Sequence, residues 1–199
     1  MAASRTLRDI TGMGETPARV GNSALVLIDC QNTYREGIMQ LEGVEPALEQ
    51  CRDLLLRYRE AGRPVIHIQH DEGPGTPYDV RERIGAIADL VAPREGEDVV
   101  VKTYPSSFEK TNLDDLLKAH GVEDIALVGF MTHVCVSSTA RAAFNHGYRP
   151  TVIGNATATR SLPNPSGGVV SAKTLHEASL AGLNDIFAVV VSSADQIPD

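Results

Sequence analysis

Short apolar runs of strand length alternate with segments of helical periodicity along most of the chain. Residues 23–29 are continuously apolar until they end in a carboxylate, as expected of a parallel strand buried on both faces. From Val44 to Tyr58 apolar residues recur every three or four positions, with Pro46 in the first turn and Gly62 as a stop, which predicts an amphipathic helix. Such alternation favours right-handed crossovers and a parallel sheet covered on both faces.

The rest of the chain continues this alternation. We predict strands at 64–69, 98–102, 124–129, 149–154 and 186–191, helices at 112–120, 134–146 and 170–183, and weak helical character at 78–90. The predicted fold is α/β, with three α/β/α layers around a Rossmann-like, open and mostly parallel six-stranded sheet. Residues 1–22 form a predicted N-terminal arm, and residues 23–199 a single domain, which suits a chain of 199 residues.

Charge and cysteine content narrow the function classes. With 18 Lys+Arg against 26 Asp+Glu, the net charge is −8, so we do not expect a nucleic acid partner. The apolar runs are far shorter than the ~20 residues that cross a bilayer, and the charged first 22 residues do not read as a secretory signal. Three cysteines without a CxxC pair fit a reducing compartment. We expect a cytoplasmic homo-oligomer, a dimer or tetramer, that acts on a small molecule and binds no membrane.

Three chemically active side chains fall on one edge of the predicted sheet. Asp29 ends the first strand, Lys102 ends the third, and Cys135 opens the helix after the fourth. A helix start favours the thiolate form of a cysteine, an aspartate can accept and return its proton, and a lysine can keep that carboxylate ionised. Singly, each has a structural explanation, as a helix cap, a solvated strand end or a small core residue. Together they predict a catalytic set.

The other two cysteines are weaker candidates for the nucleophile. Cys51 lies in the apolar stripe of its predicted helix, which favours the core. Cys30 follows Asp29 directly, so strand alternation turns it to the opposite side. We therefore expect Cys135 to be the reactive thiol.

Three motifs surround the candidate residues: LIDCQNTY at Asp29, VVVKTYPSSF at Lys102 and GFMTHVCVSSTARAAF at Cys135. From about residue 24 to residue 191 the chain resembles the isochorismatase-like cysteine hydrolases, which include isochorismatase, nicotinamidase and N-carbamoylsarcosine amidohydrolase. The resemblance implies that these three residues form the catalytic triad. It also implies that Cys135 forms a covalent intermediate on a C–N substrate.

Two geometric expectations come with the resemblance. It implies a cis peptide bond between Phe130 and Met131, which would turn the amides of Met131 and Cys135 toward one point as an oxyanion hole. It also suggests the strand order 3-2-1-4-5-6, in which Lys102 starts two strand spacings, or ~9.6 Å, from Asp29. Sheet twist and the long lysine side chain must then close that distance.

No metal or cofactor is expected. Nicotinamidases carry an Asp and two His residues as metal ligands after the second strand, where this chain has His67, His70 and Asp71 at a different spacing. Alternation places at least one of the two histidines on the opposite side of the strand, so a three-ligand site lacks partners. No GxGxxG fingerprint follows the first strand, which argues against a dinucleotide.

Several polar and aromatic residues flank the motifs and are candidates for substrate binding: Gln31, Tyr34, Phe108, Phe130 and His133, with Tyr104 beside them. The aromatic ones could equally be core, and His133 is the best candidate for tuning specificity. Arg141 lies nearly two helical turns beyond Cys135, which favours a solvated or interface role. Thr132 and Thr139 are expected to secure the turn and the helix.

The sequence favours a cofactor-free cysteine hydrolase that cleaves a C–N bond of a small amide, ureido or carbamoyl compound. One alternative is hydrolysis of an isochorismate-type vinyl ether, in which the aspartate supplies acid chemistry and no thiol is needed. Another is a non-catalytic binding protein on the same fold. The presence of Cys135 argues against the first alternative, and the intact set of three against the second.

Overall fold

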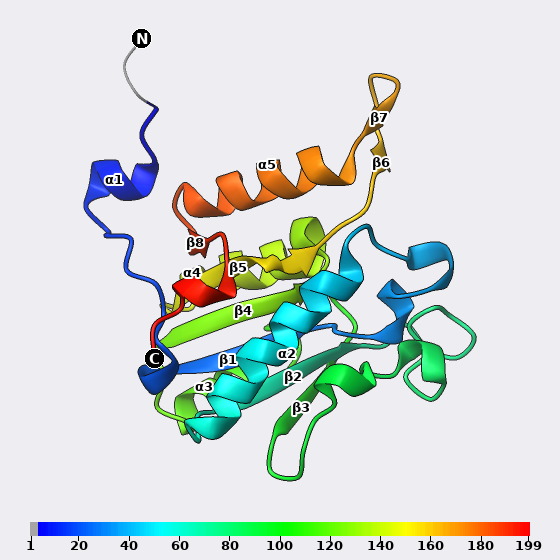
Figure 1. Cartoon of the computed structure of the whole chain (residues 1–199), viewed down its shortest axis with the longest axis horizontal. Helices are drawn as coiled ribbons and strands as arrows, with labels where there is room; N and C mark the ends of the chain where they lie inside the picture. The colour runs from blue at the N-terminus through cyan, green and yellow to red at the C-terminus, as the bar shows by residue number, and fades with distance from the viewer. Residues whose placement is uncertain (1–3) are drawn as a thin grey trace.

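The computed structural model describes residues 4–199, so residues 1–3 of the predicted arm lie outside the described part. Six parallel strands form one sheet in the order β3-β2-β1-β4-β5-β8 (Figure 1). The strands are β1 (Ser23–Ile28), β2 (Val65–His70), β3 (Asp98–Lys102), β4 (Asp124–Phe130), β5 (Arg149–Ala158) and β8 (Val189–Val191). The predicted α/β fold and its strand order are confirmed.

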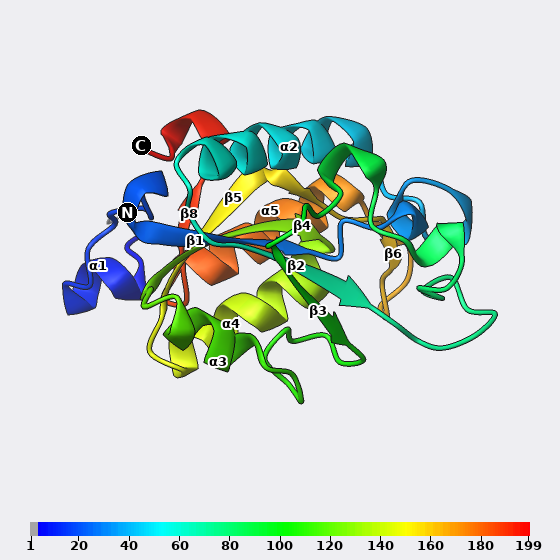
Figure 2. The ribbon, with the colours of Figure 1, turned by 90° about the horizontal axis from the view of Figure 1, so that it is seen from below.

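Helices cover both faces of the sheet. The α-helices are α1 (Leu7–Thr11), α2 (Val44–Glu60), α3 (Leu113–Ala119), α4 (Ser137–Asn145) and α5 (Ala172–Asn184). Figure 2 shows α2 on one side of the sheet and α3 and α4 on the other. Alternate residues of β1 feed the two cores: Leu25 and Leu27 pack on the side of α2, whereas Val26 and Ile28 pack on the side of α3 and α4. Burial of both strand faces explains the continuous apolar run.

Short helical turns fill several connections. The 3₁₀ turns are Val20–Asn22, Asn32–Tyr34, Gly37–Met39, Arg83–Gly85, Asp89–Val91 and Ala194–Gln196, and Thr132–Val136 is one π-helical turn. The helix predicted at 134–146 therefore begins as this π turn and becomes α-helical only at Ser137. A π turn spaces backbone hydrogen bonds more widely than an α-helix, and such turns are frequent at functional sites.

The weak helical character expected at 78–90 takes the form of two 3₁₀ turns, Arg83–Gly85 and Asp89–Val91, and no α-helix forms in this segment. Its backbone pairs with the chain that follows β1: Asn32 N donates to Ala86 O at 3.0 Å, and Ala88 N donates to Cys30 O at 2.8 Å. A side chain at Gly85 would place its Cβ 2.3 Å from the carbonyl oxygen of Asp79. This close packing fixes an irregular wall beside the end of β1.

Two segments project beyond the three layers. A hairpin of β6 (Leu162–Pro163) and β7 (Val169–Val170) extends past one end of α5, and α1 lies near its other end (Figure 1). The arm is attached by hydrogen bonds, because Leu7 N donates to Asp185 Oδ1 at 2.9 Å and the Arg8 guanidinium donates to Ile186 O at 3.1 Å.

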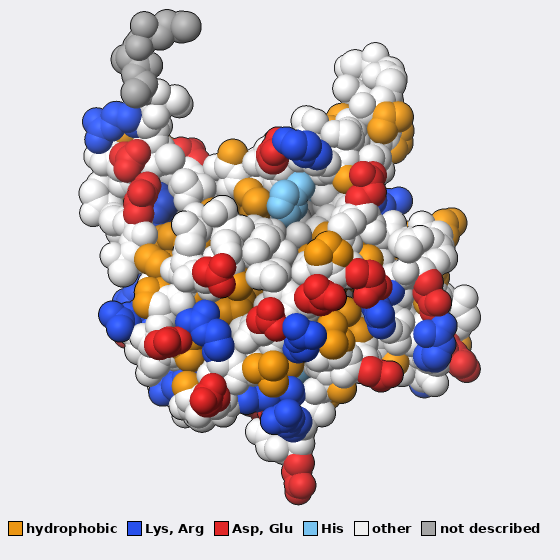
Figure 3. Space-filling model, viewed as in Figure 1, with side chains coloured by type: hydrophobic (Ala, Val, Ile, Leu, Met, Phe, Trp, Pro, Cys, Tyr) orange, Lys and Arg blue, Asp and Glu red, His pale blue; other side chains and the backbone are white. Residues whose placement is uncertain are grey.

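Acidic and basic side chains are interspersed over the side of the molecule that is seen in Figure 3. None of the helices among residues 4–199 has the length and apolar character needed to cross a membrane.

Candidate active site

Asp29 and Lys102 meet at the carboxyl edge of the sheet. Asp29 follows β1 in the left-handed region, with φ of 49°, a conformation uncommon for residues other than glycine and found at functional sites. The side chains of both residues are fully buried, and Lys102 Nζ lies 2.8 Å from Asp29 Oδ2. The long lysine side chain therefore spans the intervening strand β2.

Cys135 reaches the same point from the π turn after β4. Gly129, at φ +108°, lets the end of β4 pair closely with the end of β1, because a Cβ there would lie 2.0 Å from the carbonyl oxygen of Ile28. The peptide bond between Phe130 and Met131 is cis. Lys102 Nζ donates to Cys135 Sγ at 3.5 Å.

His70 is a fourth member of the cluster that the sequence analysis missed. It ends β2 in register with Lys102, and its Nδ1 lies 3.0 Å from Lys102 Nζ. Its Nε2 lies 2.8 Å from Glu72 Oε1. The sequence signal for this role is weak: the strand order places β2 between the strands that end in Asp29 and Lys102, and His70 follows the predicted strand 64–69 directly.

The surroundings of Cys135 disfavour its thiolate. Burial raises the pKa of the Cys135 thiol well above its ordinary value, the Asp29 carboxylate raises that pKa further, and the Lys102 ammonium lowers it. The expectation of a lowered pKa from the helix start is therefore wrong, because burial and the Asp29 carboxylate together outweigh the Lys102 ammonium. Within residues 4–199, the buried Oδ1 of Asp29 has no hydrogen-bond partner, so it is free to accept a proton.

A small cavity of about 170 Å³ opens onto Cys135. It is lined by Tyr34, His70, Glu72, Tyr78, Pro105, Met131, Val134 and Cys135. The Tyr34 ring packs edge-on against the rings of Tyr78 and Phe130, with 5.8 Å between centroids in each pair. Because pockets for drug-sized ligands measure roughly 300–1,000 Å³, this smaller cavity suits a molecule of few heavy atoms.

The candidate substrate-binding residues do not all line the cavity. Tyr34 lines the cavity, and Phe130 lies behind it in the core. His133 bonds Thr159 Oγ1 through Nδ1 at 2.5 Å and does not line the cavity, although it precedes Val134 and Cys135, which do.

Gln31 and Phe108 also lie outside the lining of the cavity. Both polar atoms of the Gln31 amide are engaged in hydrogen bonds to the backbone. Nε2 donates to His70 O and Gly85 O, and Oε1 accepts from His70 N. Phe108 does not line the cavity, because its ring stacks on His146 with centroids 4.9 Å apart. Gln31 thus holds His70 in place, and Phe108 belongs to the packing around α4.

Other residues singled out in the sequence have structural contacts. Thr132 Oγ1 lies 2.9 Å from His176 Nδ1, and Thr139 Oγ1 accepts from Ser107 N at 3.0 Å. The Arg141 guanidinium lies over the Phe187 ring at 4.1 Å. Tyr104 is exposed, and its hydroxyl accepts from Lys110 Nζ at 2.8 Å.

Cys30 and Cys51 lie in the apolar core between the sheet and α2, whereas Cys135 belongs to the core on the opposite face of the sheet. Cys51 Sγ donates to Ala156 O at 3.3 Å, and its predicted place in the core is confirmed. The pKa of Cys30 is raised by its contact with Cys51 and by burial.

The histidines of β2 engage separate carboxylates. His67 Nε2 lies 2.9 Å from Glu97 Oε2, whereas His70 faces Lys102 and Glu72. In the part of the chain that the structure describes, no three His, Cys, Asp or Glu side chains are grouped so that they could hold a metal ion. Independence from metal stays a prediction.

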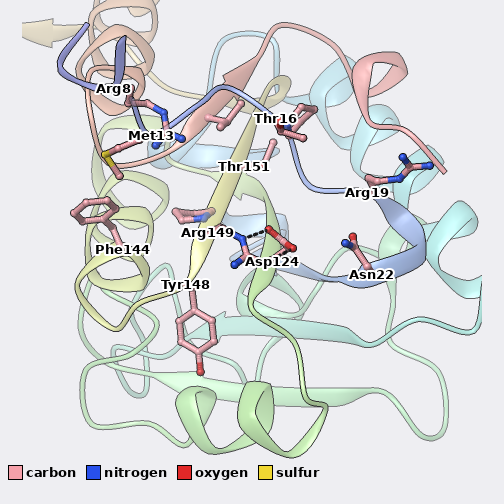
Figure 4. A pocket seen from close by; sticks show the side chains of 13 residues that line it. Arg8, Met13, Thr16, Arg19, Asn22, Asp124, Phe144, Tyr148, Arg149 and Thr151 are labelled. Carbon is pink, nitrogen blue, oxygen red and sulfur yellow. Dashed lines mark hydrogen bonds and ion pairs between the residues drawn. The ribbon is translucent and has the colours of Figure 1, made fainter. Parts of the chain in front are cut away.

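A larger cavity of about 300 Å³ lies at the opposite edge of the sheet, beside the N-terminal arm (Figure 4). Its charged side chains already have partners: Arg149 pairs with Asp124 at 2.8 Å, and Arg8 donates to Gly14 O at 2.8 Å. The first pair joins the starts of β4 and β5, and the second lies within the arm. The candidate active site is placed at Cys135 by the contacts of Lys102 with Asp29 and Cys135, not by the size of the cavity.

Comparisons with known proteins show which family the chain resembles. The model of the isochorismatase domain matches residues 23–195. The chain is 36% identical over 191 residues to the secreted isochorismatase effector Isc1 of Verticillium dahliae, covering 96% of this chain and 98% of that protein. It is 28% identical to maleamate amidohydrolase of Pseudomonas putida, covering 92% and 86%. The crystal structure of an isochorismatase from Pseudomonas putida KT2440 superposes with a TM-score of 0.94 at 34% identity, covering 98% and 100%.

Proposed function

The chain belongs to the isochorismatase family, and from that premise we propose that it is a cysteine hydrolase that cleaves a C–N bond of a small amide, ureido or carbamoyl compound. The observation that carries the proposal is the position of Lys102, whose Nζ lies 2.8 Å from Asp29 Oδ2 and 3.5 Å from Cys135 Sγ. The small cavity above Cys135 supports a small substrate. A relative named maleamate amidohydrolase supports an amide.

In the proposed first half-reaction, Asp29 acts as a general base. Its free Oδ1 takes the proton of the Cys135 thiol as the sulfur attacks the carbonyl carbon, so the raised thiol pKa does not prevent reaction. The amides of Met131 and Cys135 would stabilise the oxyanion that forms. Asp29 then gives the proton to the leaving nitrogen, the C–N bond breaks, and the acyl group stays on sulfur.

In the second half-reaction, water replaces the amine. Asp29 takes a proton from the water as its oxygen attacks the acyl carbon, and the C–S bond then breaks. The proton returns to sulfur, which restores the thiol and releases the acid. Throughout, Lys102 donates one N–H to the Asp29 carboxylate and offers another to the sulfur.

A second candidate is hydrolysis of an isochorismate-type vinyl ether, which the name of the Verticillium relative favours. In that reaction Asp29 would protonate the double bond, and Cys135 would not form a covalent bond. The two candidates therefore differ in their need for the thiol.

Ammonia release from a panel of small primary amides and ureas, measured beside isochorismate turnover, tests the proposal. We expect at least one amide or urea to be hydrolysed by the wild type and not by Cys135→Ser. Isochorismate turnover that survives Cys135→Ser would favour the second candidate. Activity on neither class would favour a non-catalytic binding protein on this fold.

The proposal includes a reducing, cytoplasm-like compartment and a homo-oligomer. The three cysteines are free and buried, which suits a reducing compartment. The Verticillium relative is named as secreted, so cell fractionation of the source organism is the deciding measurement for location. Size-exclusion chromatography with light scattering decides the oligomeric state.

A further inference from the structure

The Lys102 ammonium is surrounded by three acceptors of different chemistry. Its Nζ lies 2.8 Å from Asp29 Oδ2, 3.0 Å from His70 Nδ1 and 3.5 Å from Cys135 Sγ. An ammonium has three N–H donors and no acceptor, so each N–H has one partner. The direction of the N–H that faces sulfur therefore depends on His70 as well as on Asp29.

The tautomer of His70 follows from this contact. Because Lys102 can only donate, Nδ1 of His70 must accept and carries no hydrogen. The ring hydrogen then lies on Nε2, which donates to Glu72 Oε1 at 2.8 Å. The backbone N–H of His70 donates to Gln31 Oε1 at 2.8 Å, and the ring packs edge-on against Tyr78 with centroids 5.0 Å apart. Three contacts thus hold the imidazole ring, and a fourth holds the backbone of His70.

We propose that His70 is a positioning residue for Lys102 and that Glu72 fixes the tautomer it needs. This inference rests on the proposed function, since the direction of the Lys102 ammonium matters only if Asp29 and Cys135 react. Without an acceptor at the position of Nδ1, the ammonium would turn away from its present geometry and the N–H at sulfur would be misdirected. The thiolate that forms during attack would then lose its nearest positive charge.

Two amide variants separate the nitrogens of the ring. His70→Asn keeps an acceptor close to the position of Nδ1 and loses the link to Glu72. His70→Gln keeps a polar group near the position of Nε2 and removes the acceptor that faces Lys102. Both side chains are polar and uncharged, so the pair is matched except for which contact survives.

Two readouts are measured on each variant. The first is the rate at which iodoacetamide alkylates Cys135, followed by peptide mass mapping, which needs no substrate. The second is kcat and KM on the best substrate of the amide and urea panel. For His70→Gln we expect kcat to fall roughly 10²-fold with KM little changed, the effect of an ~1 Å misplacement, and alkylation to slow about tenfold. His70→Asn should recover most of both rates.

Equal losses in the two variants, or a change confined to KM, would overturn the inference, because the acceptor at Nδ1 would then not be what matters. Thermal unfolding shows whether each variant folds. If neither does, Glu72→Ala decides, since the Glu72 side chain is half exposed: slower alkylation of Cys135 supports the inference, and an unchanged rate overturns it. Should no substrate be found, the proposed function fails, whereas alkylation still decides the role of His70.

Discussion

The Cys135 thiol is subject to opposing influences from its neighbours. Burial raises its pKa, Asp29 raises it further, and Lys102 lowers it, with a net increase. In the proposed mechanism, the resting cysteine therefore keeps its proton and becomes a nucleophile only when Asp29 accepts that proton. The sequence predicted a lowered pKa because a helix start can be read from a pattern, whereas depth of burial at one position cannot.

The pH dependence of alkylation tests this state of the thiol. Below its pKa, a thiol becomes about ten times more reactive per pH unit, and an ordinary cysteine levels off near its pKa of about 8.5. Because the pKa of Cys135 is raised, its alkylation by iodoacetamide should keep rising from pH 7 to pH 10 without a plateau. Peptide mapping identifies the labelled cysteine. A plateau below pH 9 would contradict the raised pKa.

The role of Asp29 is tested by its amide. Asp29→Asn should fold and keep an oxygen for Lys102, but its amide cannot take a proton, so the rate should fall ~10²–10⁴-fold. Cys135→Ser should lose comparable activity, and the double variant should be little worse than either single one, because residues that act as a unit are not additive. Steady-state kinetics with circular dichroism measures both. Near wild-type turnover of Asp29→Asn would end the acid/base assignment.

For single residues, the placement of Asp29, Lys102 and Cys135 at one edge of the sheet could be predicted, because strand ends can be located from apolar runs. His70 was not assigned to the cluster, since its contact with Lys102 depends on the register of β2 against β3 and on a side-chain direction. Neither can be read from the local pattern of β2.

At the scale of elements, Glu97 ties the turn before β3 to β2 and α2. Its carboxylate pairs with Arg59 of α2 at 2.6 Å and lies 2.9 Å from His67 of β2. Burial alone would raise the pKa of Glu97, but Arg59, the backbone N–H of Arg94 and His67 together lower it to about 2. The ionised carboxylate thus joins three segments.

The pH dependence of the free energy of unfolding tests these contacts of Glu97. Since the folded pKa of Glu97 lies below its ordinary value of 4.5, its contribution is present above pH 4.5 and is lost as the pH falls toward 2. At pH 7, Glu97→Gln should lower the free energy of unfolding by on the order of 2 kcal/mol, and at pH 3 by clearly less. Urea unfolding at the two pH values measures this. The same loss at both would contradict the assignment.

The strands and the main helices could be predicted from periodicity, and their boundaries shift by a few residues at most except in β5. That strand continues to Ala158 because a bulge lets its second half pair again with the end of β4. The 78–90 segment could not be predicted, because its conformation is set by contacts with the chain after β1. The π turn at Thr132–Val136 has no sequence pattern of its own.

At the scale of the whole molecule, the two edges of the sheet have different roles. The carboxyl edge gathers Asp29, Lys102, His70 and Cys135 beneath a small cavity, as expected of an open α/β sheet. The amino edge carries a larger cavity whose charged groups are paired among themselves. Topology predicts which edge is reactive, whereas the size of the cavity and the attachment of the arm depend on tertiary packing.

The proposed mechanism requires a covalent bond between Cys135 and the acyl part of the substrate. Rapid quenching of the enzyme with its best amide or urea in acid, followed by intact-protein mass spectrometry and peptide mapping, tests it most directly. We predict an adduct equal to the substrate minus its leaving amine, located on Cys135, formed and lost at rates compatible with turnover. Turnover without an adduct at Cys135, together with full activity of Cys135→Ser, would contradict this mechanism.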